Sequence, residues 1–185
     1  RKFKPWLIVL GVDCRLWNIF SENLNFSQDR QRLQQLRELE LPLVLFAVEV
    51  ALIQIQNGRF FLLENPERSR LWLLEAVVQL LNMPGVWSIV LDAGAWGAEI
   101  DGQMIIKPMR FVGNVPGLED VIHKRLSAHE KQWCQPIQGA MTKKSQEYPD
   151  ALVNAILRHL RQVIQRLEPF RFNINEVFAV AEPVK

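Results

Sequence analysis

The sequence predicts an α/β domain in which a mostly parallel sheet is flanked by helices. Three apolar runs are typical of buried strands: WLIVLGV at 6–12, RFFLLENP at 59–66 and VWSIVLDA at 86–93. Two stretches with helical spacing, 28–56 and 69–82, separate them. Strands joined by helical crossovers pair in parallel, so this order indicates a Rossmann-like arrangement.

The first half of the chain supports this order element by element. The run at 6–12 is apolar throughout, as expected of a central strand covered on both faces. Ser27 can cap a helix over 28–56, and Pro42 is expected to kink it or to start a second segment. Gly58 then ends the helix, and the second strand follows directly.

The second half has weaker periodicity until its last helix. Asp101-Gly102 predicts a hairpin turn that leads into a strand over 104–112. A helix is expected over 117–126, and an amphipathic helix over 149–167. We therefore expect one domain over 1–167 and a C-terminal tail over 168–185.

Composition limits the classes of protein to which the chain can belong. Its 185 residues, 49% hydrophobic and 23% charged, suit one globular domain, and the net charge of +2 gives no general attraction to nucleic acid. Its longest apolar stretches are too short or too interrupted to span a bilayer. We expect no metal site, because His123, His129 and Cys134 lack a clear fourth ligand.

Cysteine usage and the first residue add two expectations. Cys14 and Cys134 lie far apart without the spacing of a zinc site or a disulfide, which favours an intracellular, nuclear or cytoplasmic protein. The chain starts at Arg1 and not at Met, so we expect a processed chain or an excised segment.

Polar residues follow each of the three predicted strands. Cys14 comes after the first, Glu64 closes the second and Asp92 closes the third. Ligands of open α/β sheets bind at the carboxyl ends of the strands, where a cysteine can act as a nucleophile and a glutamate as an acid or base. Each residue alone is more often structural, and their common position favours a site.

These residues resemble the cytosine carbon-5 DNA methyltransferases, and among them the type embedded in retroelement polyproteins of unicellular eukaryotes. The family's catalytic loop has a cysteine followed by an aromatic residue and Ser, and Cys14 is followed by Trp17 and Asn18. Its Glu-Asn-Val signature corresponds to 64–66, and its Ala-x-x-Tyr-Gly signature to 93–97. The resemblance covers roughly residues 6–114 and implies a methyltransferase fold.

The resemblance also implies the chemistry. Cys14 would attack carbon 6 of a cytosine flipped out of DNA, Glu64 would bond its nitrogen 3, and S-adenosylmethionine would supply the methyl group. Asn114 echoes a Gly-Asn motif and would contact the cofactor. Further contacts to the base or backbone would come from Asn65, Trp17, Trp96, Lys107 and Arg110.

The sequence departs from the family at four points, and at one of them Ala98-Glu99 replaces Pro-Gln. Asp13 replaces a proline and places a carboxylate beside the thiol, and Asn18 replaces the serine. The glycine-rich turn that holds the cofactor is absent, so the chain resembles the second half of a methyltransferase sheet. The missing N-terminal strands would come from the rest of a longer polypeptide. The alternative is a non-catalytic nucleic-acid-binding or structural module of a mobile-element polyprotein.

Overall fold

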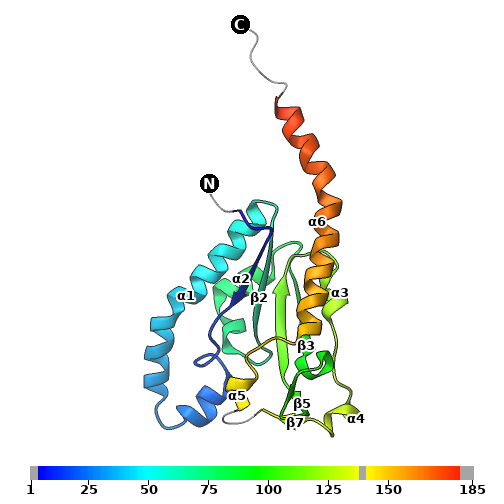
Figure 1. Ribbon diagram of the computed structural model, residues 1–185. Coiled ribbons are helices and arrows are strands. Elements are labelled where there is room, and N and C mark those ends of the chain that lie inside the picture. Colours follow the sequence, from blue (N-terminus) through cyan, green and yellow to red (C-terminus); the bar gives the residue numbers. More distant parts are fainter. Residues whose placement is uncertain (1–3, 138–140, 180–185) are drawn as a thin grey trace.

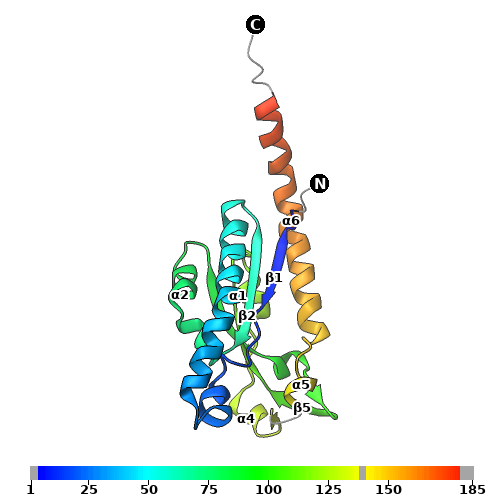
Figure 2. The ribbon, with the colours of Figure 1, turned by 90° about the vertical axis from the view of Figure 1, so that its left-hand side faces the viewer.

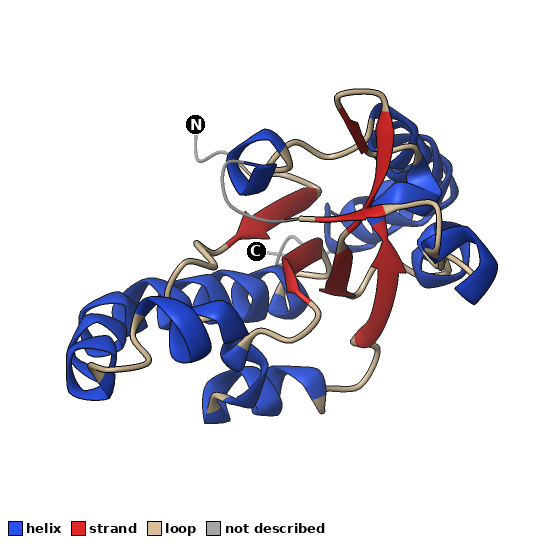
Figure 3. Cartoon of the chain, turned by 90° about the horizontal axis from the view of Figure 1, so that it is seen from below, coloured by secondary structure: helices blue, strands red, loops and turns tan. Residues whose placement is uncertain are grey.

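The computed structural model describes residues 4–137 and 141–179, with side chains in the last helix described as far as Leu167. A four-stranded sheet forms its centre. Helices α1 and α2 cover one face of the sheet, and α3 and α6 cover the other (Figures 1 and 3). The α/β class expected from the sequence is confirmed.

The central sheet is mixed, so the expectation of a mostly parallel sheet is wrong for the described residues. Its strands are β1 (Leu7–Gly11), β2 (Phe60–Pro66), β3 (Trp87–Asp92) and β6 (Pro108–Gly113), in the order β1-β2-β6-β3. Only β1 and β2 form a parallel pair, and β6 is antiparallel to both of its neighbours. It follows that β1, β2 and β3 all run in the same direction. The carboxyl ends of these three strands lie together at one end of the sheet, beside the amino end of β6.

The expectation that β1 is a central strand is wrong within the described residues. β1 pairs with β2 on one side and forms the edge of the sheet on the other. Its apolar side chains pack in part on both faces, with Leu7 on the α6 side and Leu10 on the α1 side, while Val9 is 51% exposed. A continuous apolar run therefore indicates that side chains pack on both faces of a strand. It does not show whether both edges of the strand are hydrogen-bonded to neighbouring strands.

Helix α1 (Arg30–Gln56) is a single, uninterrupted helix. Its cap is Asp29, whose side chain accepts from Arg32 N at 2.8 Å, and not the expected Ser27. Pro42 lies inside the helix and neither kinks it into two segments nor starts a new one. Buried residues on both sides of the proline, including Leu33 and Val44, hold the helix against the sheet.

The segments between α1 and β6 differ in part from the expectation. The stretch at 69–82 contains a 3₁₀ turn (Arg70–Leu73) followed by α2 (Glu75–Leu81). The expected hairpin is present as β4 (Glu99–Ile100) and β5 (Gln103–Ile106), with positive φ at both residues of the turn. The predicted strand over 104–112 is divided at Lys107, because β5 pairs with β7 (Gln135–Pro136) in a separate small sheet.

The remaining helices are α3 (Leu118–Ile122), α4 (Ala128–Lys131), α5 (Met141–Lys144) and α6 (Asp150–Ala179). Helix α6 confirms the predicted amphipathic helix and continues into the expected tail. Its far end projects beyond the other elements (Figures 1 and 2). None of the helices within the described residues is long and apolar enough to cross a bilayer.

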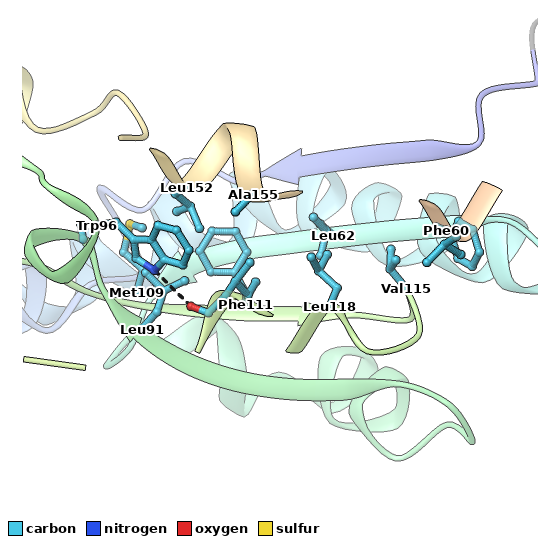
Figure 4. Close-up of a cluster of buried hydrophobic side chains, with 13 residues drawn as sticks. Phe60, Leu62, Leu91, Trp96, Met109, Phe111, Val115, Leu118, Leu152 and Ala155 are labelled. Atoms are coloured by element: carbon cyan, nitrogen blue, oxygen red, sulfur yellow. Dashed lines mark hydrogen bonds between the residues drawn. The ribbon is translucent and has the colours of Figure 1, made fainter. Parts of the chain in front are cut away.

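Each face of the sheet has its own hydrophobic core. On the α6 face, Leu62 of β2, Phe111 of β6 and Leu152 of α6 are almost completely buried together (Figure 4). On the α1 face, Phe61 and Leu63 pack against α1 and α2. Burying the apolar surface of a large side chain contributes about 1.5–3 kcal/mol, so these two cores hold the strand ends in place.

Candidate functional site

Cys14 lies in the loop that leaves the carboxyl end of β1. Its carbonyl oxygen accepts from Trp17 N at 3.1 Å, from Asn18 N at 2.9 Å and from Asn18 Nδ2 at 2.9 Å. The Asn18 Oδ1 atom in turn accepts from Ser21 N at 3.0 Å. Asn18, which stands where the family has serine, therefore fixes the backbone of the Cys14 loop.

The rest of this loop is anchored to α1 and to the 3₁₀ turn. Glu22 pairs with Arg37 at 3.0 Å and with Arg70 at 2.7 Å, and its carboxylate is largely buried. The hydrogen bond from Arg70 is the main reason that the pKa of Glu22 is lowered. The loop that carries Cys14 is thus held at its two ends, by β1 and by this ion-pair cluster.

Glu64 lies at the carboxyl end of β2 and has an unexpected partner. It is paired in register with Gly11 of β1 on one side and with Phe111 of β6 on the other. Tyr148, just before α6, donates its hydroxyl to Glu64 Oε2 at 2.8 Å. The Tyr148 ring also packs against Phe111, with centroids 6.1 Å apart.

Lys107 comes to the same place because the predicted strand breaks there. Its carbonyl accepts from Ala93 N at 2.9 Å, which holds the break against the end of β3. Its ammonium donates to Ser145 O and interacts electrostatically with both Cys14 and Glu64. The end of the sheet where β1 and β2 terminate therefore holds a thiol, a carboxyl, an ammonium and a phenol. We call these four groups the polar cluster: Cys14, Glu64, Lys107 and Tyr148.

Burial dominates the electrostatics of the polar cluster. Burial, and then the charges of Asp13 and Glu64, raise the pKa of Cys14, while Lys107 opposes them. Burial raises the pKa of Glu64 against the hydrogen bond from Tyr148 and the charge of Lys107, and burial lowers the pKa of Lys107. The pKa of Tyr148 is raised by burial and by Glu64. Each group is therefore shifted toward its neutral form.

Asp13 lies on the exposed side of the same loop. Its carboxylate accepts from Arg15 N at 2.8 Å and pairs with Arg15 Nε at 2.7 Å. The carboxylate still acts on Cys14, since it is the second cause of the raised pKa of the thiol. Asp13, which stands where the family has proline, therefore disfavours the thiolate form of Cys14, as the sequence indicated.

Asn65 has a structural role and is not placed to contact a base. Its Nδ2 donates to Val12 O at 2.7 Å, which joins the carboxyl ends of β1 and β2. Its side chain is almost fully buried on the α1 side of the sheet, opposite the face of Glu64. Its Oδ1 has no hydrogen-bond donor among the described residues.

The two tryptophans expected to stack on a flipped base are both core residues. Trp17 is 3% exposed on the α1 side, with the Arg37 guanidinium 5.5 Å from its ring centroid. Trp96 is 8% exposed on the α6 side, where it lies beside Leu91 and Met109 and donates to Ile122 O at 3.1 Å (Figure 4). Both rings are buried within the two cores in this structure, and their stacking on a base stays a prediction.

The two remaining predicted contact residues also lie away from the polar cluster. Arg110 donates to Ser88 Oγ at 3.0 Å and lies over the Trp72 ring on the α1 face. Asn114 lies at the other end of the sheet, where its side chain accepts from Phe61 N at 2.9 Å and donates to Arg59 O at 3.0 Å. Asn114 therefore ties β6 to the start of β2.

The third strand end is structural as well. Asp92 is completely buried, and its Oδ2 pairs with Arg125 Nε at 3.0 Å and accepts from Leu126 N at 2.9 Å. Gly94 follows it, and a Cβ at Gly94 would collide with the carbonyl of Ile105. Residues 93–97, which match the family signature, therefore include a glycine at which the backbone packs closely against β5.

The described residues form no recognisable cradle for S-adenosylmethionine. No glycine-rich turn follows a strand, and Asn114 is engaged with the backbone of β2. We therefore derive no step through this cofactor.

The structure brings three of the predicted site residues together, Cys14, Glu64 and Lys107, and adds Tyr148, which the sequence did not indicate. Tyr148 is the chain's single tyrosine and directly precedes the Pro149 start of the predicted helix. Its place directly before the helix is the one feature of the sequence that singles out Tyr148. No protein-family model, curated protein or solved structure matches the chain.

Proposed function

We propose that the polar cluster is a cytosine-binding site of the cytosine carbon-5 methyltransferase type. One observation carries this proposal: Cys14, in the loop after β1, and Glu64, at the end of β2, lie at the same end of the sheet and interact electrostatically there. The resemblance requires this pair, a thiol for carbon 6 and a carboxyl for nitrogen 3. The Rossmann-like half of a methyltransferase fold is part of the same proposal.

In this proposal each group of the polar cluster has a role. The Cys14 thiolate adds to carbon 6, and the ring accepts a proton as the new carbon–sulfur bond forms. Burial raises the pKa of Glu64, which favours the protonated form that donates to nitrogen 3. The Lys107 ammonium lowers the pKa of Cys14 and so favours the thiolate. Tyr148 bonds Glu64 Oε2, which leaves Oε1 to bond the base.

The addition step can be measured without a methyl donor. Reversible addition of a thiolate to carbon 6 makes carbon 5 basic, so the hydrogen at carbon 5 exchanges with solvent before the thiolate leaves. Incubation of the chain with a cytosine-containing oligonucleotide in deuterated buffer should give deuterium at carbon 5, detected by mass spectrometry. The rate should rise with pH because the pKa of Cys14 is raised.

Matched variants separate this chemistry from background exchange. Cys14→Ser and Glu64→Gln should abolish the exchange, and Cys134→Ser should not, because Cys134 is a buried cysteine on the small β5–β7 side. Exchange that survives Cys14→Ser would refute the proposal.

A specific observation favours the alternative, a non-catalytic module. In the structure, the Glu64 carboxylate is occupied by Tyr148, and Lys107 is bound to the backbone at Ser145. Such contacts suit a polar cluster that joins the segment before α6 to the sheet. Under this reading no exchange occurs, and Tyr148→Phe only lowers stability.

A further inference from the structure

One face of α1 exposes large apolar side chains away from the sheet. Leu39, Leu43, Phe46 and Ile53 are 77%, 66%, 62% and 43% exposed. Together with two partly buried neighbours they recur at alternating steps of three and four residues, and we call this set the α1 stripe: Leu36, Leu39, Leu43, Phe46, Val50 and Ile53. This spacing is that of a helix–helix seam.

The α1 stripe is distinct from the face that packs on the domain. The opposite side of α1 buries Val44, Val48 and Ala51 against β2 and α2. A shallow groove of about 350 Å³ lies between the stripe and the edge of β1, lined by residues 9–13 with Glu40, Leu43, Phe46 and Ala47. α1 and β1 lie side by side at this edge of the molecule (Figure 2). A contiguous apolar face of this kind marks an interaction surface.

The charges around the α1 stripe restrict what can cover it. From Glu38 to Gln56 the helix carries three glutamates, Glu38, Glu40 and Glu49, and no lysine or arginine. Asp13 also lines the groove, but its carboxylate is paired with Arg15 and adds no net charge there. The nearest basic residue of the helix, Arg37, is already paired with Glu22. The flank is therefore acidic on a chain whose net charge is +2.

This acidic flank disfavours two occupants. A second copy, packed α1 against α1 about a two-fold axis, would place the same glutamates opposite one another. An anionic membrane surface would repel them. We propose that the α1 stripe docks an amphipathic helix of a partner polypeptide, whose apolar seam is flanked by Lys or Arg.

The test uses two synthetic helical peptides of about three heptads with the same Leu/Ile seam, flanked by Lys in one and by Glu in the other. Binding to the full chain is measured by fluorescence anisotropy. The Lys-flanked peptide should bind, and the Glu-flanked peptide should bind about tenfold more weakly. The difference should shrink at about 1 M salt, where surface charges are screened.

Point variants locate the binding. Phe46→Glu and Leu43→Glu should remove binding of the Lys-flanked peptide without changing the circular dichroism spectrum, because both side chains are exposed. Leu157→Glu, on α6, is the matched control and should leave binding unchanged, since Leu157 is 55% exposed on another surface.

Several outcomes would overturn the proposal. They are no binding of the Lys-flanked peptide, equal affinity for both peptides, or binding unaffected by Phe46→Glu. Sedimentation of the chain as a dimer that Phe46→Glu dissociates would assign the α1 stripe to a second copy. Binding to anionic vesicles that Phe46→Glu abolishes would assign it to a membrane.

Discussion

Removal of the Tyr148 hydroxyl should destabilise the protein in a pH-dependent way. The hydroxyl donates to Glu64 Oε2 at 2.8 Å, and this bond lowers the pKa of Glu64 against the effect of burial. A hydrogen bond to an ionised carboxylate contributes about 1.5–3 kcal/mol, and a bond between neutral groups contributes about 0.5–1.5 kcal/mol. Tyr148→Phe should therefore cost about 2 kcal/mol where Glu64 is charged and about 1 kcal/mol where it is protonated.

The sign follows from linkage. The folded-state pKa of Glu64 is raised above its ordinary value, so its contribution to stability is complete below that ordinary value and falls as the pH rises through the raised pKa. Tyr148→Phe removes a group that lowers this pKa, so the folded-state pKa rises further. The variant should accordingly lose more stability on the alkaline side of this transition than at acid pH.

Urea denaturation of wild type and Tyr148→Phe at about pH 4 and about pH 8 measures the two costs. At the alkaline pH, the midpoint should fall by about 1 M. Glu64→Gln is the control: in that background the cost of Tyr148→Phe should no longer depend on pH, because the amide does not titrate. Equal costs at the two pH values in the wild-type background would refute the assigned role of the Tyr148–Glu64 bond.

Three further predictions concern Cys14 and two structural side chains. Lys107→Met should slow alkylation of Cys14 by iodoacetamide and Asp13→Asn should speed it, because Lys107 lowers and Asp13 raises the pKa of the thiol; unchanged rates in a mass-spectrometric time course would contradict this. Asp92→Ala should cost about 1–3 kcal/mol in urea denaturation, because it leaves the buried amide of Leu126 without its acceptor. Asn114→Ala should cost about 1–3 kcal/mol, because it leaves the amide of Phe61 without its acceptor, and it should leave Cys14 alkylation unchanged.

Local patterns predicted the elements that local forces determine. The strands β2 and β3, the hairpin at Asp101-Gly102 and the long last helix all appear where apolar periodicity and turn residues indicated them. The edge position of β1 could not be predicted from its residues. Apolar side chains indicate packing on the faces of a strand, and they say nothing about which strands pair with it. The continuity of α1 through Pro42 likewise depends on tertiary packing.

The candidate site was predictable only in part, for a physical reason. Cys14 and Glu64 follow strands that run in one direction, and the parallel β1–β2 pair brings their carboxyl ends together. Tyr148 reaches Glu64 through the path of the segment before α6, which no local pattern encodes. Trp17 and Trp96 lie in the two cores, because an aromatic residue after a strand packs equally well beneath the sheet.

If Cys14 and Glu64 act together on a cytosine ring, the ring should be captured covalently. The chain is incubated with an oligonucleotide containing 5-azacytosine, whose carbon 6 is open to thiolate addition, and the adduct is digested and mapped by mass spectrometry. We expect one modified peptide, joined to the base through Cys14 and lost in Glu64→Gln. An adduct at Cys134, or the absence of any adduct at Cys14, would contradict this expectation.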